Sequence, residues 1–221
     1  MRGMLGMASV CLALAAAPHA AAQVSEDVIA GLTGTWMVLP VDGSPGCTIQ
    51  LALEQTIGGR LAVPSDECVQ HVPDIAEASA WYPTSGIAFS DAIRRPVMAF
   101  EEDETTLLSS PSVADPAFYL VPAQPGLTRV PQPADMPGTW RFTSGSIACT
   151  LQFEAGSGDG GTVHLAPECP KSELPVAMRR WRLQALGLLL EGDGDGGMAF
   201  RAVADGQFDG EGEKRLTRVP D

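Results

Sequence analysis

The stretch Cys47-Thr48-Ile49-Gln50-Leu51-Ala52-Leu53 places Cys47, Ile49, Leu51 and Leu53 at every second position, with polar side chains at Thr48 and Gln50. It returns 102 residues later as Cys149-Thr150-Leu151-Gln152-Phe153-Glu154. Alternation with a period of two is typical of a β-strand that turns one face toward a core. The chain therefore uses this strand twice.

The repetition extends well beyond this strand. The first copy contains Gly34-Thr35-Trp36, Cys68, Trp81 and Met98-Ala99-Phe100, and these recur in the same order as Gly138-Thr139-Trp140, Cys169, Trp181 and Met198-Ala199-Phe200. The match uses all four tryptophans and four of the five cysteines. Because both residue types are rare, we infer a tandem duplication of one domain of about 100 residues.

Further short alternating stretches indicate an all-β fold in each copy. In the first copy the expected strands are Thr35 to Val41, Arg60 to Val63, Ser79 to Tyr82, Ile87 to Ser90, Val97 to Glu101, Thr105 to Leu108 and Phe118 to Val121. With the cysteine strand they make about eight, which favours a small antiparallel up-and-down β-barrel, because closure removes exposed edges. A two-sheet sandwich is the alternative. We expect the barrels at residues 34–121 and 138–221.

Residues 1–22 have the charged, apolar and small-residue parts of a Sec signal peptide, with cleavage expected near Ala22-Gln23. Val10 before Cys11 argues against a lipid anchor at Cys11, which remains the alternative. The predicted destination is the periplasm or the exterior.

Export affects how the remaining cysteines are interpreted. The duplication favours pairing Cys47 with Cys68 and Cys149 with Cys169, one disulfide in each copy. A zinc site is the alternative, but neither copy has a close cysteine pair or a histidine at ligand spacing. We therefore predict no metal site.

Residues 122–137 contain five prolines, at 122, 125, 131, 133 and 137. Proline disfavours both helix and strand ladders, so we expect an extended, semi-rigid linker between two separate barrels.

Charge and hydropathy exclude several classes of partner. Without Arg2, 13 basic residues face 27 acidic ones, a net charge of −14. Such a chain does not favour nucleic acid or anionic lipid, and no span of about 20 apolar residues follows the signal. We expect a soluble monomer without a cofactor.

Catalysis has little support in the sequence. His71 and His164 do not occupy matching places in the two copies. The acidic run Glu101-Glu102-Asp103-Glu104 corresponds to Arg201-Ala202-Val203-Ala204 in the second copy, so it is not repeated either. We therefore predict no catalytic residues. The glycine-rich run Gly192 to Gly197 occurs once and favours a hairpin loop over a calcium site. Because they recur in the framework, Trp36, Trp81, Trp140 and Trp181 are expected to be scaffold residues, with ligand stacking as the alternative.

The framework resembles the Inh family of bacterial metalloprotease inhibitors and its outer-membrane lipoprotein relatives. The motifs are clearest in the first copy, as Leu32-Thr33-Gly34-Thr35-Trp36, Gly46 to Leu51, Glu67-Cys68 and Ala80 to Ala88. The second copy carries the closing pattern better, from Gly206 to Leu216. Together the two copies cover nearly all of the chain after the signal.

The resemblance implies an eight-stranded barrel with one disulfide that inhibits secreted zinc endopeptidases of the serralysin type. In that family a free N-terminal tail enters the protease cleft. The corresponding tail here is residues 23–33, which fully extended span about 36 Å. The residues expected to bind the protease are Gln23, Val24, Ser25, Glu26 and Asp27.

Two departures from the family pattern stand out. Ser25-Glu26-Asp27 is polar where the family tail is small and apolar, and the second copy has a tethered linker in place of a free tail. Only the first copy is therefore expected to inhibit by the family mechanism. The alternative functions are a binding module for a small apolar ligand and a structural protein of the envelope.

Overall fold

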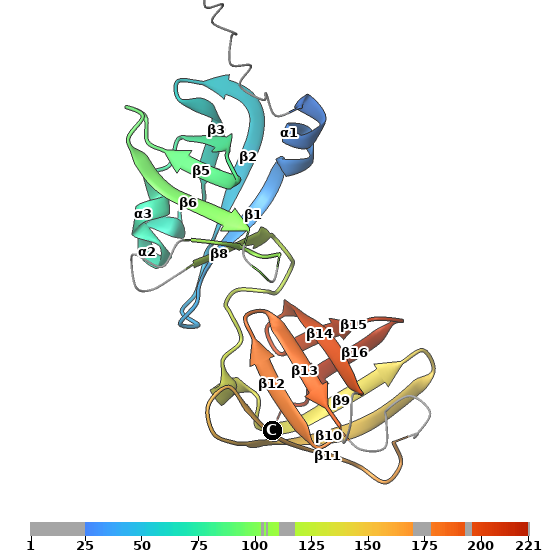
Figure 1. Cartoon of the computed structure of the whole chain (residues 1–221). Helices are drawn as coiled ribbons and strands as arrows, with labels where there is room; N and C mark the ends of the chain where they lie inside the picture. The colour runs from blue at the N-terminus through green and yellow to red at the C-terminus, as the bar shows by residue number, and fades with distance from the viewer. Residues whose placement is uncertain are drawn as a thin grey trace, which may run out of the picture.

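The computed structural model describes residues 25–102, 104, 106–110, 118–169, 178–192 and 196–220. The predicted signal peptide, Gln23 and Val24 lie outside these residues. Two closed antiparallel barrels of eight strands each account for most of the described chain (Figure 1). The predicted all-β fold is confirmed. Each copy forms the predicted barrel and not the two-sheet sandwich that was the alternative.

In the first barrel each strand pairs with the next, and the last pairs with the first. Its strands are β1 (Gly34–Pro40), β2 (Cys47–Thr56), β3 (Gly59–Pro64), β4 (Ala80–Pro83), β5 (Gly86–Ser90), β6 (Pro96–Glu102), β7 (Leu108–Ser109) and β8 (Phe118–Pro122).

The second barrel has the same order and closure. Its strands are β9 (Gly138–Ser144), β10 (Ile147–Ala155), β11 (Gly160–Leu165), β12 (Arg180–Gln184), β13 (Gly187–Glu191), β14 (Gly197–Ala204), β15 (Gln207–Gly210) and β16 (Lys214–Arg218).

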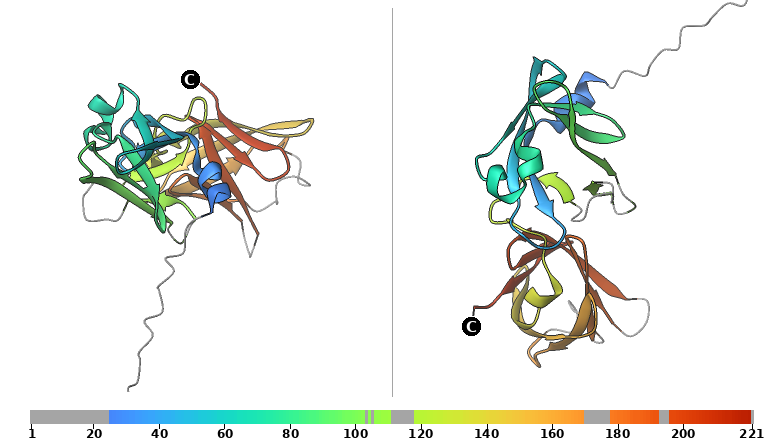
Figure 2. Two further views of the ribbon diagram at one scale, coloured as in Figure 1. Left: turned by 90° about the horizontal axis from the view of Figure 1, so that it is seen from above. Right: turned by 90° about the vertical axis from the view of Figure 1, so that its left-hand side faces the viewer.

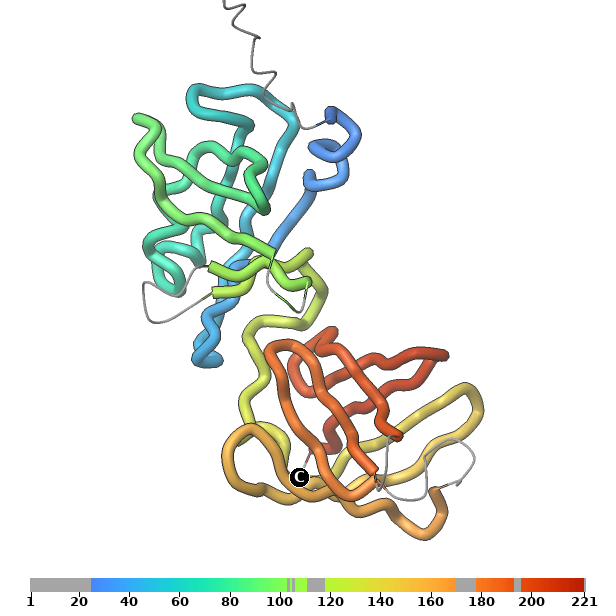
Figure 3. The backbone as a smooth tube through the Cα atoms, viewed as in Figure 1, coloured from blue at the N-terminus to red at the C-terminus, as the bar shows by residue number. Residues whose placement is uncertain are grey.

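Four short helical segments complete the described structure: α1 (Glu26–Leu32), α2 (Cys68–His71), α3 (Pro73–Ala76) and the 3-10 turn η1 (Pro133–Asp135). The α2 and α3 helices lie together between β3 and β4, and η1 precedes β9. Figure 3 follows the resulting path of the chain through the first barrel, the linker and the second barrel.

Strand alternation fills both barrels much as the sequence predicts. Ile49 and Leu51 are fully buried in the first barrel, as are Leu151 and Phe153 in the second. The prediction that Leu53 faces the core is wrong, because its side chain is half exposed. The β2–β3 pairing is irregular between Leu51 and Gln55, so the strict alternation of β2 ends after Leu51.

Both predicted disulfides are present, Cys47–Cys68 and Cys149–Cys169, at sequence separations of 21 and 20. Each joins the start of the second strand of its barrel to the segment that follows the third. Closing loops of this length contributes about 3 kcal/mol each by restricting the unfolded chain.

The four tryptophans lie in or against the cores of the two barrels. Trp81, Trp140 and Trp181 are almost completely buried, whereas Trp36 is only partly buried. Trp140 packs against the rings of Phe153 and Phe208, with centroids 5.6 and 5.7 Å away. The first barrel has smaller leucines at both equivalent positions, Leu51 and Leu108.

The linker does more than separate the barrels, because it is packed against both of them. Its side chains Leu127, Val130 and Met136 are buried. Its backbone binds both barrels, because Gly46 N–H donates to Thr128 O at 2.9 Å and Asp205 N–H donates to Gly126 O at 2.8 Å. The barrels thus supply the hydrogen-bond partners of these linker carbonyl groups.

The first barrel turns an apolar outer face toward this linker. On β1 and β8, Met37, Leu39 and Val121 alternate with the inward-facing residues and join the same buried cluster as Leu127 and the core of the second barrel. The Gln132 amide also donates to Val41 O at 3.1 Å. The two barrels therefore pack against each other across the linker, and the right-hand view in Figure 2 shows them next to one another.

Exchanging Met37 for Arg, the residue at the equivalent second-barrel position 141, should loosen this packing. We expect a loss of about 2 kcal/mol of unfolding free energy, because a buried apolar side chain is replaced by a charge. Urea unfolding measures this loss, and small-angle scattering should show a larger maximum dimension. The reverse exchange Arg141→Met, at an exposed site, is the control, and equal effects of both exchanges would contradict the packing described.

An Asp-centred loop closes the turn between β5 and β6. The Asp91 carboxylate accepts hydrogen bonds from Ile93 N–H at 2.9 Å, Arg95 N–H at 2.8 Å and the Arg95 guanidinium at 2.7 Å. Burial raises the pKa of Asp91, but the bonds from Arg95 and Ile93 outweigh it, so the pKa lies below its ordinary value. The ionised form is therefore the one that the fold favours.

Because the pKa of Asp91 is lower in the folded state, its contribution to stability is present above about pH 4 and is lost as the pH falls through the folded-state pKa. We expect Asp91→Asn to destabilise the first barrel at neutral pH and to differ less from the native protein near pH 3. Urea unfolding at both pH values checks this. A difference that stays constant with pH would exclude the carboxylate as its source.

Candidate functional site

The N-terminal segment begins with a capped helix. The Ser25 hydroxyl accepts a hydrogen bond from Val28 N–H at 3.4 Å, and Glu26 and Asp27 occupy the first turn, where negative charge suits the helix dipole. The helix ends at Leu32, one residue before Thr33. The extended conformation expected for residues 23–33 is therefore wrong for Glu26–Leu32.

Packing holds α1 on the barrel. Ile29 is buried in the core cluster of the first barrel. The Glu26 carboxylate binds the Arg60 guanidinium at 3.0 and 3.2 Å. Only 11% of the Arg60 side chain is exposed, and it also donates to Leu53 O at 2.9 Å. Because Glu26 itself is 82% exposed, this pair orients the helix more than it stabilises the fold.

Sequence reasoning missed Arg60 as part of this site. The signal available was the scarcity of positive charge, since residues 25–121 contain only three basic residues. That scarcity does not reveal which of the fourteen acidic residues in the same range meets Arg60, because Glu26 lies 34 positions away.

The segment before the first strand is anchored in the same way in both barrels. The Trp36 indole N–H donates to Leu32 O at 2.8 Å, and the Trp140 indole N–H donates to Met136 O at 2.8 Å. Each tryptophan thus fixes the carbonyl four residues earlier. In the first barrel this fixes the end of α1, and in the second it fixes the end of the linker.

A groove of about 400 Å³ lies beside α1. Val28 and Leu32 form one wall, and the turn between β4 and β5 forms the other with Pro83 and Ile87. Glu102 is a charged residue at its edge. The predicted protease-binding residues Ser25, Glu26 and Asp27 thus lie at the start of a helix that borders an open, mainly apolar groove.

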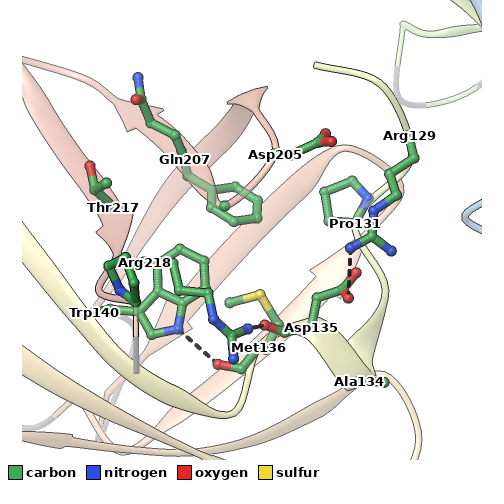
Figure 4. A pocket seen from close by; sticks show the side chains of 13 residues that line it. Arg129, Pro131, Ala134, Asp135, Met136, Trp140, Asp205, Gln207, Thr217 and Arg218 are labelled. Carbon is green, nitrogen blue, oxygen red and sulfur yellow. Dashed lines mark hydrogen bonds and ion pairs between the residues drawn. The ribbon is translucent and has the colours of Figure 1, made fainter. Parts of the chain in front are cut away.

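The second barrel has a larger pocket, of about 620 Å³, beside the linker (Figure 4). Met136, Trp140 and Phe208 supply its apolar lining. Arg129 pairs with Asp135 at 2.9 Å, and Arg218 donates to the carbonyl oxygens of Asp135 and Pro137. The charged groups that line the pocket are already engaged in an ion pair and in hydrogen bonds within the protein.

The other residues considered in the sequence do not assemble into a reactive site. His71 hydrogen-bonds to Gly46 O at 2.8 Å, whereas His164 meets Glu154 at 3.4 Å on the surface of the second barrel. Glu101 and Glu102 are exposed at the end of β6, and Asp103 and residues 193–195 lie outside the described residues. Over the described ranges, no group of three His, Cys, Asp or Glu side chains is placed to hold a metal ion.

The helices of the described chain are all short, and none is long and apolar enough to cross a membrane.

Comparison with known families identifies the second barrel. The family model described as protease inhibitor Inh matches residues 130–218. A comparison with the curated proteins finds no match. The matched range contains all of β9 to β16, whereas the sequence motifs had placed the clearest resemblance in the first copy. The first barrel departs from the second in its two-residue β7 and its longer β1–β2 connection.

This family consists of inhibitors and not of enzymes, and the two disulfides accord with an extracytoplasmic protein. Residues 130–218, which hold the second barrel, therefore belong to the protease inhibitor family Inh, and the first barrel repeats the framework of the second.

Proposed function

We propose that this protein inhibits secreted zinc endopeptidases of the serralysin type, with the N-terminal segment of the first barrel in the active-site cleft. The family match supports inhibition of a protease. The observation that carries the role of the first barrel is the placement of α1: the segment before β1 is attached to the barrel at one side only, whereas residues 122–137 are attached at both ends.

The docked helix changes how such a tail works. With cleavage after Ala22, only Gln23, Val24 and Ser25 precede α1, and three extended residues reach about 10 Å. The tail is therefore short and its base is rigid. A segment whose base is already ordered loses less entropy on binding than a free peptide, which favours tight inhibition.

The groove beside α1 gives the barrel a surface for the rim of the cleft. Val28 is exposed and borders the groove, and Leu32 and Ile87 continue its apolar lining. Burying this surface against the protease would add apolar contacts to those of the tail. The second barrel lies at the other end of the first barrel from α1 (Figures 1 and 2), and the groove approaches it only at Thr106, which also lines a hollow beside the second barrel.

Inhibition should depend on a free N-terminus. We expect the mature protein beginning at Gln23 to inactivate a serralysin-type protease with one-to-one stoichiometry. Adding Gly-Ser-Gly before Gln23 should weaken inhibition by about 100-fold or more, because the cleft must then accommodate a longer chain. Titration of protease activity measures both results.

The same extension placed after Asp221 is the matched control and should leave inhibition unchanged. Equal inhibition by both extended proteins would exclude the tail mechanism. If the protein inhibits a serine protease and not the zinc enzyme, the proposed inhibitory function stands but the proposed class of target protease is wrong.

Ordering of the tail by α1 can be tested separately. Ile29→Asp should detach the helix from the core, and we expect inhibition to weaken by about ten-fold or more as the tail becomes flexible. Ala30→Asp adds the same charge at the next, exposed position of the helix and should have little effect. Thermal unfolding verifies that both variants keep the barrel. Equal inhibition by both variants would show that the docked helix is not needed.

A further inference from the structure

The second barrel carries an arginine-rich outer face that no part of the inhibitory site uses. Arg180 and Arg182 project from β12, and Arg201 projects from β14. The Arg180 and Arg182 side chains are 70% and 53% exposed. We call these three residues the arginine face. Strands β12, β13 and β14 form the side of the second barrel that is turned toward the viewer in Figure 1.

The duplication shows that the fold does not require these charges. Arg201 lies opposite Gly187, and the equivalent pair in the first barrel is Glu101 opposite Gly86. Arginine thus stands where the first barrel has a carboxylate. The other two positions are Ala80 and Tyr82, beside the shared Trp81. The same framework therefore carries a basic surface in the second barrel only.

Among the described residues, one carboxylate pairs with two of the three arginines of this face. Glu191, on the intervening strand β13, binds Arg182 at 2.5 Å and Arg180 at 3.6 Å. Arg201 has no hydrogen-bond or ion-pair partner among the described residues. Asp209 lies opposite it on β15, but that carboxylate is held by both guanidinium nitrogens of Arg215, at 2.6 and 2.8 Å.

An apolar hollow adjoins the arginine face. It measures about 300 Å³ and lies between Leu107 of the first barrel and Leu189 and Ala199 of the second, with Arg201 in its lining. Leu189 stands opposite Arg182 on one side and Ala199 on the other. The guanidinium groups of the arginine face therefore lie next to a hollow that can accept an apolar side chain.

We propose that the arginine face and this hollow bind a short, extended, acidic segment of a partner protein. Arg180 and Arg182 lie two residues apart on one strand, about 6.7 Å, which is also the spacing of same-side residues in an extended peptide. Guanidinium groups bind carboxylates through two parallel hydrogen bonds. Two acidic side chains of the segment meet these arginines or Arg201, and an apolar side chain enters the hollow.

The surrounding charge favours a short segment over a long polyanion. Residues 25–121 carry three basic against fourteen acidic residues, and Glu104 lies close in sequence to Thr106, which lines the hollow. A nucleic acid or an anionic membrane would extend past the arginine face to this acidic side and be repelled. A short acidic peptide stays on the arginine side.

Fluorescence anisotropy of a labelled peptide of alternating glutamate and leucine, titrated with the mature chain, tests the proposal. We expect saturable binding that weakens as salt is raised. Arg201→Glu should weaken it by at least about ten-fold, since it reverses one contact charge. Arg141→Glu makes the same change on β9, at the opposite side of the barrel, and should leave binding within about two-fold of the native value.

A triple variant gives the second arm of the test. Arg180→Ala, Arg182→Tyr and Arg201→Glu together restore the first-barrel residues on an otherwise intact face, and we expect binding to be lost while protease inhibition and thermal unfolding are kept. Equal weakening by Arg201→Glu and Arg141→Glu overturns the site. Tighter binding of inorganic polyphosphate than of the peptide, or Arg201-dependent dimerisation of the chain in light scattering, overturns the stated partner.

Discussion

Each sheet is closed by the hydrogen bonds between its first and last strands, β1 with β8 and β9 with β16, and the positions of all other functional elements depend on this closure. A first strand that is paired on both sides cannot shift, so the chain leaves it from a fixed point. Trp36 and Trp140 extend that constraint by holding the carbonyl four residues upstream. The position of α1, and therefore of any tail before it, follows from barrel closure.

The two barrels use one framework for different purposes. In the first barrel the outer face of β1 and β8 is apolar and is covered by the linker, while the segment before β1 forms the helix α1. In the second barrel the segment before β9 is fixed by Gly46, Asp205 and Trp140, and charge has been placed on the outside of β12 and β14. Residues on the inside are alike, and those on the outside differ with the role of each barrel.

Local patterns in the sequence were sufficient to predict the barrels and the disulfides, because period-two alternation indicates strand faces and the recurrence of rare residues indicates a duplicated framework. The α1 helix escaped prediction because seven residues form a helix here only with support from Ile29 packing and from Arg60, which is distant in sequence. The linker prolines did not reveal the 3-10 turn at Pro133–Asp135 or the binding of the linker backbone, since its partners come from both barrels. The strand expected at Thr105 to Leu108 is only Leu108–Ser109, and Leu53 faces outward because pairing becomes irregular beside it.

The contrast between Met37 and Arg141 also bears on how such a chain grows by duplication. The first barrel has an apolar outer surface, made of Met37, Leu39 and Val121, on which the following linker packs. The equivalent positions on the second barrel are Arg141, Thr143 and Thr217. A third barrel added behind the second would find no apolar surface on which to seat its linker. The same framework thus has two different outer faces: β1 and β8 accept the linker that follows them, whereas β9 and β16 offer polar side chains there.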